Sequence, residues 1–279
     1  MQTNEYDMFY SDMAEVCLKR LEEKRVNCQP SSSSVERPFK LLVKNEVFTV
    51  DSKKLSKLSP IFALMCYGRD FEGGRELARE IVDENSSDIA TFLQCLQDHH
   101  KINEWNVPVL LRLSNKYQVE SLTKACCSYL ETTNLENVKP DQVLTLLISA
   151  HDHHLPKSTI SPIILRLAQE SRTVYTRLRL NRFLPANLYT AVIATNMNLT
   201  TLGSVAKMNG HFFRIDRNSI SYKKALCSMC KKIVDSAECE GCKLTLCQNH
   251  WQTAGCHNEF GKKMLAQLKE QLVDVELDY

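Results

Sequence analysis

Hydrophobic and polar positions in the first half of the chain change from a strand-like to a helix-like period. Residues 39–50, FKLLVKNEVFTV, form two short apolar runs around a polar Lys-Asn pair, which predicts a β-hairpin. Helical spacing follows over 51–67, and residues 79–82 predict another short strand. Helical spacing then recurs over 88–130. Strands followed by a cluster of helices predict an α+β domain.

Residues 8–25 in front of this domain also have a helical period. One apolar stripe runs along the expected helix and consists of Met13, Val16, Cys17 and Leu21. Such a stripe must cover either its own domain or a partner. The serine-rich residues 27–38 carry too little apolar surface to form a core, so we expect a flexible loop there.

The second half of the chain is mostly helical in pattern. Over 133–215 we expect helices of roughly ten to twenty residues, broken by Pro140, Pro156, Pro162 and Pro185. Residues 208–222 are expected to be a linker. Near the C-terminus, apolar residues at every fourth position after Phe260 predict a last helix, and the final VDVELDY is expected to fray or to dock on a partner.

Composition and charge narrow the class of protein. The net charge of the 279 residues is only +2, so no overall basic field demands nucleic acid as a partner. The first residues lack the apolar run of a signal peptide, and no apolar stretch approaches eighteen residues. The six cysteines before residue 128 are scattered, which indicates reduced thiols. We therefore expect a cytoplasmic or nuclear protein.

The remaining six of the twelve cysteines lie between Cys227 and His257. Two C-x2-C pairs are followed by a C-x2-H pair and a terminal Cys-His, and each pair can place two ligands on one turn, as tetrahedral zinc requires. The run has almost no apolar core of its own, so metal binding would supply its folding energy. The candidate zinc ligands are Cys227, Cys230, Cys239, Cys242, Cys247, His250, Cys256 and His257.

This donor set favours a structural zinc over a catalytic one. Catalytic sites keep one coordination position open and favour histidine and carboxylate ligands, whereas this set is rich in thiolates. No phosphate-binding glycine loop or recognisable catalytic triad occurs, so we expect a protein that is not an enzyme. The histidines of 151–154, the arginines of 166–182 and the lysines around the cysteine run are interpreted as solvated surface. Phosphate contact by the lysines is the alternative.

The first half of the chain resembles a BTB (POZ) domain. The resemblance rests on FTVDSKKLSKLSPIFALM at 48–65, the strand end at 81–83 and the helical pair at 110–130. Divergent versions of this kind look most similar to nematode members. The resemblance implies a homodimer that packs through the N-terminal stripe Met13, Val16, Cys17 and Leu21. It also implies a possible cullin contact through Phe62, Met65, Tyr67 and Phe71.

The cysteine run resembles a B-box finger and the finger of stress-associated ubiquitin-system proteins. In such cross-brace modules the first and third ligand pairs share one metal, which implies Cys227, Cys230, Cys247 and His250. The second and fourth pairs would then be Cys239, Cys242, Cys256 and His257. Because Cys256 and His257 are adjacent, unlike the last ligands of either finger, both one zinc and two zincs stay open.

The expected organisation is an α+β BTB domain with an N-terminal dimerisation helix, an all-α extension that resembles BACK-type segments, and a zinc-stabilised module followed by a helix. The expected boundaries are 1–26, 27–38, 39–132, 133–215, 222–260 and 261–279. The expected function is a homodimeric adaptor or scaffold that binds protein partners through the finger and the helical extension. The alternatives are a substrate adaptor of a cullin-type ubiquitin ligase and a nuclear or RNA-associated regulatory factor.

Overall fold

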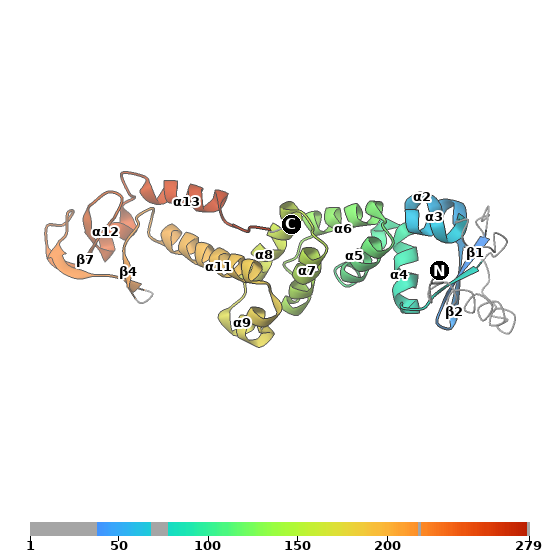
Figure 1. Cartoon of the computed structure of the whole chain (residues 1–279). Coiled ribbons are helices and arrows are strands. Elements are labelled where there is room, and N and C mark those ends of the chain that lie inside the picture. The colour runs from blue at the N-terminus through green and yellow to red at the C-terminus, as the bar shows by residue number, and fades with distance from the viewer. Residues whose placement is uncertain (1–37, 68–77, 217–218, 278–279) are drawn as a thin grey trace, which may run out of the picture. The chain divides into compact units, whose positions relative to one another are not determined.

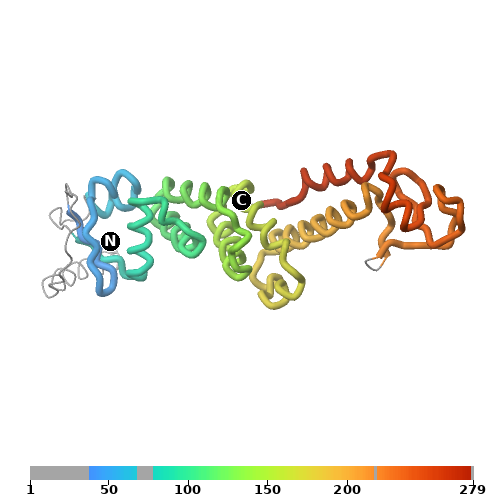
Figure 2. The backbone as a smooth tube through the Cα atoms, turned by 180° about the vertical axis from the view of Figure 1, so that it is seen from behind, coloured from blue at the N-terminus to red at the C-terminus, as the bar shows by residue number. Residues whose placement is uncertain are grey.

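The computed structural model describes residues 38–67, 78–216 and 219–277. The expected N-terminal helix with Met13, Val16, Cys17 and Leu21, the serine-rich loop and Phe71 lie outside these ranges. The chain divides into two compact units. One comprises Met1–Asn134 with Thr145–Thr159, and the other comprises Leu135–Leu144 with Ile160–Tyr279. Figures 1 and 2 show the elements of both from opposite sides.

A three-stranded sheet begins the first unit. Strands β1 (Pro38–Val43) and β2 (Glu46–Asp51) pair antiparallel, and β3 (Ala78–Ile81) pairs parallel to β1, so the order is β2-β1-β3. Lys44 in the turn has a left-handed φ of 52°. The hairpin and the short third strand predicted from the apolar pattern are therefore confirmed.

Two helices follow the hairpin, and polar side chains set where they begin. The Asp51 carboxylate accepts hydrogen bonds from the backbone N–H groups of Lys53 and Lys54 (3.0 and 3.3 Å) at the start of α2 (Ser52–Leu58). The Ser59 hydroxyl accepts from the N–H of Phe62 (3.0 Å) at the start of α3 (Pro60–Tyr67). Asp51 thus occupies the position in front of the first helix as a cap.

Helices α4 (Ser86–Gln97), α5 (Val107–Lys116) and α6 (Glu120–Thr132), with the 3-10 turn η1 (His99–Lys101), complete the helical cluster. Phe62, Phe92 and Tyr117 meet in its core. The rings of Phe62 and Tyr117 stack at 4.6 Å, and those of Phe92 and Tyr117 lie 5.8 Å apart. Burial raises the pKa of Tyr117 to about 12.

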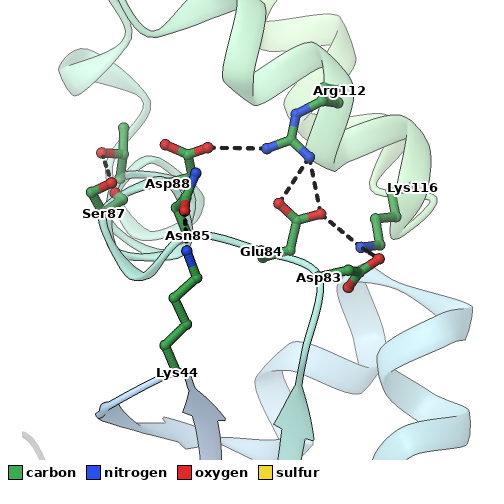
Figure 3. Close-up of polar contacts among 9 residues, drawn as sticks. Lys44, Asp83, Glu84, Asn85, Ser87, Asp88, Arg112 and Lys116 are labelled. Carbon is green, nitrogen blue, oxygen red and sulfur yellow. Dashed lines mark hydrogen bonds and ion pairs between the residues drawn. The ribbon is translucent and has the colours of Figure 1, made fainter.

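A buried carboxylate joins the end of β3 to α4 and α5. The Glu84 side chain is only 2% exposed, and Arg112 Nη1 donates to both of its oxygens (2.9 and 2.8 Å). Lys116 Nζ bridges Glu84 and Asp83 (2.6 and 2.7 Å), and Arg112 also reaches Asp88 (3.1 Å), as Figure 3 shows. The hydrogen bond from Lys116 lowers the pKa of Asp83.

The segment after the BTB-like region is helical, as expected. Its helices are α7 (Pro140–Asp152), α8 (Lys157–Ala168), α9 (Arg172–Leu178), α10 (Leu180–Phe183) and α11 (Ala186–Lys207). The expectation that Pro162 breaks a helix is wrong, because it lies inside α8. A proline there removes a single backbone hydrogen bond, and the well-buried neighbours Ile160, Ile163 and Ile164 hold the helix in place.

The C-terminal residues return along α11. Helix α13 (Phe260–Glu270) runs beside α11, as both views show. Beyond it, Asn198 donates to the carbonyl of Leu272 (3.3 Å), and Asn187 donates to that of Glu276 (3.1 Å). Val275 is buried. The last described residues therefore dock on their own chain.

The cysteine run forms a small β-rich module between these two helices in sequence. Strands β6 (Lys223–Leu226), β7 (Ile233–Glu238) and β8 (Thr245–Cys247) form an antiparallel sheet in the order β6-β7-β8, followed by the short helix α12 (Gln248–Thr253). Two short strands, β4 (Ile215–Asp216) and β5 (Ser219–Ile220), pair antiparallel in front of this sheet in sequence. Among the described helices, none has the length and apolar character needed to cross a membrane.

Candidate metal centre

The two C-x2-C pairs fold into separate turns that have the same conformation. The N–H of Lys231 donates to the carbonyl of Cys227, and the N–H of Lys243 donates to that of Cys239, each at 2.9 Å. Both lysines have a left-handed φ of 57°. The two thiols of each pair lie within 4.8 Å of each other. The repeated signal in the sequence is Cys-x2-Cys-Lys.

The first group of potential ligands contains Cys227, Cys230, Cys247 and His250. Cys227 and Cys230 come from the turn between β6 and β7, Cys247 ends β8, and His250 lies on α12. His250 Nδ1 lies 3.1 Å from Cys247 Sγ and 3.4 Å from Cys227 Sγ. The four ligand atoms lie within 4.8 Å of one another, so this group can hold one metal ion.

The second group contains His211, Cys239, Cys242 and Cys256. Cys239 Sγ lies 4.0 Å from Cys256 Sγ, and Cys242 Sγ lies 3.7 Å from His211 Nδ1. His257, which was expected here, is exposed and lies outside the group, whereas the adjacent Cys256 is buried. Neighbouring side chains of a non-helical segment point in different directions, so only one of the two faces the cluster.

His211 is oriented for metal binding by its second ring nitrogen. Nε2 lies 2.9 Å from the carbonyl oxygen of Ala254, and a carbonyl oxygen can only accept a hydrogen bond. Nε2 therefore carries the proton, and the lone pair of Nδ1 faces the thiols. A backbone carbonyl that fixes the tautomer in this way is typical of metal-bound histidines. Sequence reasoning missed this ligand because it lies sixteen residues before Cys227, in the expected linker.

Backbone N–H groups surround one sulfur in each group. Burial opposes ionisation of Cys227, but the N–H groups of Cys230, Cys247 and Met229 lower its pKa to about 6. Burial opposes ionisation of Cys239 as well, and the N–H groups of Cys242 and Phe212 lower its pKa to about 6. Each group thus has one thiol that favours the thiolate, the form that binds metal.

The donor chemistry fits zinc. Zn–S and Zn–N bonds of about 2.3 and 2.0 Å place tetrahedral ligands about 3.5 to 3.8 Å apart. The four separations given above, 3.1 to 4.0 Å, span this range, and all ligand atoms of a group lie within 4.8 Å of one another. Three cysteines and one histidine in each group supply four protein ligands, which is the composition of structural zinc sites. The cysteines in the described ranges are free thiols, so no disulfide competes for these sulfurs.

The module has a small apolar core, contrary to the expectation of almost none, and this core includes Cys239 and Cys256 of the second group. Met208 and Phe213, from the segment expected to be a linker, pack with Leu246 and Trp251. The Phe213 and Trp251 rings lie 5.8 Å apart, and Trp251 Nε1 donates to the Tyr222 hydroxyl (3.2 Å). Trp251 therefore fills the core of the module, and the module begins before its first cysteine.

The residues proposed for a cullin contact do not share one environment. Phe62 is 1% exposed and belongs to the core, so its side chain offers no surface to a partner. Met65 is half-buried, and Tyr67 is 44% exposed. Leu64, which the apolar pattern assigned to the core, is instead the most exposed apolar residue of α3. Phe71 lies outside the described residues.

The other polar clusters have structural explanations or no metal geometry. The histidines of 151–154 belong to neither group of potential metal ligands. Arg166 is not a solvated residue, because its guanidinium donates to the carbonyls of Leu135 and Val138 (2.9 and 3.1 Å) and to Glu170 (2.6 Å). Arg166 thereby anchors the segment that connects α6 to α7.

Comparison with known families agrees with the fold of the first unit. Residues 39–134 match the BTB/POZ domain family, and this part of the chain is a BTB/POZ domain. BTB domains are generally non-enzymatic interaction modules that commonly self-associate. No curated protein matches the chain. The chain thus contains a BTB/POZ domain at residues 39–134, a domain type that commonly binds protein partners, and two Cys/His groups that could hold metal ions.

Proposed function

We propose that the protein is a non-enzymatic homodimeric adaptor, in which the BTB domain sets the number of copies and the C-terminal module captures a protein partner. The BTB domain at residues 39–134 carries this proposal. The C-terminal module supports it, because its Cys/His groups each supply four protein ligands and build a surface rather than an open reaction site.

Light scattering tests the dimer. The full chain is expected to have twice the mass of one 32.0 kDa protomer. Replacing Met13 and Leu21 by Glu places charges in the apolar stripe and is expected to give the mass of one protomer. Glu22→Lys, on the opposite side of the expected helix, is the matched control. A dimer that persists with both stripe positions charged contradicts this part of the proposal.

We infer that both Cys/His groups bind structural zinc. The purified chain is then expected to contain two zinc ions, measured by elemental analysis of protein prepared without added metal. The free energy of zinc binding in small finger peptides, about 10–16 kcal/mol, is large enough to fold a module with so small a core. A metal-free module that keeps Trp251 buried would contradict the inference.

The tip of the β6–β7 hairpin is the proposed capture surface. Leu226 and Ile233 are cross-strand partners, and both are exposed, Ile233 to 74%. Met229, in the turn between them, is exposed too. Lys231 and Lys232 flank this apolar tip and are exposed. The combination favours a partner segment with apolar residues next to acidic ones, because its carboxylates complement the lysines.

A peptide library displayed on phage and selected against the full chain tests this surface. Enrichment of peptides that combine acidic and apolar residues is expected. Ile233→Ser should weaken binding of the selected peptides at least tenfold, whereas Met197→Ser, at another exposed apolar position, should not change it. If no such peptide is selected and RNA binds with a strong salt dependence, the regulatory alternative gains support.

The ubiquitin-ligase alternative rests on α3. Exposed Leu64 and Tyr67, with half-buried Met65, form a partly apolar surface on this helix. Tyr67 also lies 3.3 Å from the hydroxyl of Ser52, which holds it against α2. A pull-down with purified cullin, repeated with Leu64→Asp, Tyr67→Asp and Phe71→Asp, tests it. Capture that is lost in these variants and kept in Lys124→Met would favour the ligase adaptor.

A further inference from the structure

The second Cys/His group is assembled at a junction of three segments. His211 follows the end of α11, Cys239 and Cys242 form the turn after β7, and Cys256 precedes α13. Backbone hydrogen bonds join the same segments. The N–H of Glu240 donates to the carbonyl of Phe212 (2.8 Å), and the N–H of Gly261 donates to the carbonyl of Gly210 (3.0 Å). The junction therefore lies where both helices meet the finger.

The backbones at this junction approach too closely for side chains. A Cβ added to Gly261 would lie 2.1 Å from the carbonyl oxygen of Gly210. A Cβ on Gly241 would lie 2.2 Å from that of Phe260, the first residue of α13. Gly210 has a φ of +78°, which glycine adopts without strain. The chain carries glycine on all three segments where they converge on the second group.

The first group does not connect the finger to another part of the chain. Its four ligands all come from residues 227–250, within the sheet β6-β7-β8 and α12. A metal there ties the finger only to itself. In the second group, by contrast, one ligand lies before the finger and another lies directly before α13.

We propose that His211 is the eighth zinc ligand and that the second zinc clamps the finger to the α11–α13 helix pair. The proposal rests on the zinc-bound module proposed above. The two ions then have separate tasks: the first holds the fold of the finger, and the second fixes the finger on the helices. Loss of the second ion alone releases this joint and leaves the first site filled.

Zinc content and hydrogen exchange of the full chain test the clamp. His211→Ala is expected to lower the zinc content from two ions per chain to one, and His257→Ala, its matched control, is expected to keep two. In His211→Ala the amides of 208–213 and 260–270 should exchange at least tenfold faster, while those of 223–235 stay protected. Two ions in His211→Ala, or unchanged exchange in α13, would overturn the proposal.

A measurement on the unaltered protein guards against a variant that fails to fold. After replacement of zinc by cadmium-113, the nitrogen-15 spectrum should show metal coupling at Nδ1 of two histidines, His211 and His250. Coupling at His257 in place of His211 would refute the assignment. The dimer mass from light scattering is independent of these results, so failure of the adaptor proposal and failure of the clamp give different outcomes.

Discussion

At the scale of single residues, the BTB domain contains an almost fully buried carboxylate, Glu84, just after β3. Two cations compensate it, because Arg112 donates to both of its oxygens and Lys116 donates to one. A buried charge that keeps its partners is tolerated, whereas one that loses them is costly.

Arg112→Met is therefore expected to lower the free energy of unfolding of the first unit by about 1–3 kcal/mol. Lys124→Met is the matched control, since Lys124 pairs with Glu120 on an exposed surface and should contribute less than about 0.5 kcal/mol. Urea unfolding followed by Trp105, in a Trp251→Phe background, measures both. Equal effects of the two substitutions would argue against a special role of Glu84.

The buried thiol Cys126 predicts a loss of stability at alkaline pH. Burial raises its pKa from 9.0 to about 12. A group with a raised pKa in the folded state contributes stability that is present below pH 9 and is lost as the pH rises toward 12. Titration of Cys126 should cost the first unit about 1 kcal/mol for each pH unit just above 9, and Cys126→Ala should remove this contribution to the slope. An unchanged slope in urea titrations at pH 8 to 10.5 would contradict it.

Residue identity and spacing were enough to find seven of the eight potential ligands that the structure brings together. They could not find His211, because a single histidine far from the cysteines has no local signature. They selected His257 because it is adjacent to Cys256, but adjacent side chains in a non-helical segment point in different directions, and His257 lies outside the group. The role of His211 becomes apparent only in the folded chain, where residues 208–213 pack against the finger.

At the scale of elements, local signals predicted the hairpin and the helices well. Alternating apolar residues and the polar pair at its turn identify the first hairpin, and apolar spacing identifies α4, α5 and α6. The pattern failed where tertiary contacts decide. Pro162 remains inside α8, and residues 208–213 pack into a core although they carry no strong period.

The contact between α13 and the end of α11 gives a prediction at this scale. Gly261→Ala is expected to destabilise the C-terminal module by about 1–3 kcal/mol, because its Cβ would collide with the backbone of Gly210. Gly203→Ala, within α11 and with open space around it, should instead be neutral or stabilising by up to about 1 kcal/mol. Urea unfolding followed by Trp251, in a Trp105→Phe background, distinguishes the two. A neutral Gly261→Ala would show that the joint is loose.

At the scale of the whole molecule, the BTB domain and the C-terminal metal module differ in what stabilises them. The BTB domain has an extended apolar core in which Leu41, Phe92, Leu110 and Leu122 are fully buried. The C-terminal module has a much smaller cluster around Phe213 and Trp251. Apolar burial stabilises the BTB domain at about 25 cal/mol per Å², whereas the proposed metal ions would supply much of the stability of the C-terminal module.

Removal of zinc is therefore expected to affect the units unequally. With excess chelator, Trp251 emission in Trp105→Phe should shift to longer wavelength as its buried ring meets water, and added zinc should reverse the shift. Hydrogen exchange of α4, α5 and α6 should stay unchanged, and so should the dimer mass, because the BTB domain contains neither Cys/His group. If exchange in these helices also responds to chelator, the BTB domain depends on the metal module. If Trp251 does not respond, the apolar cluster alone holds the module, and its zinc has another role.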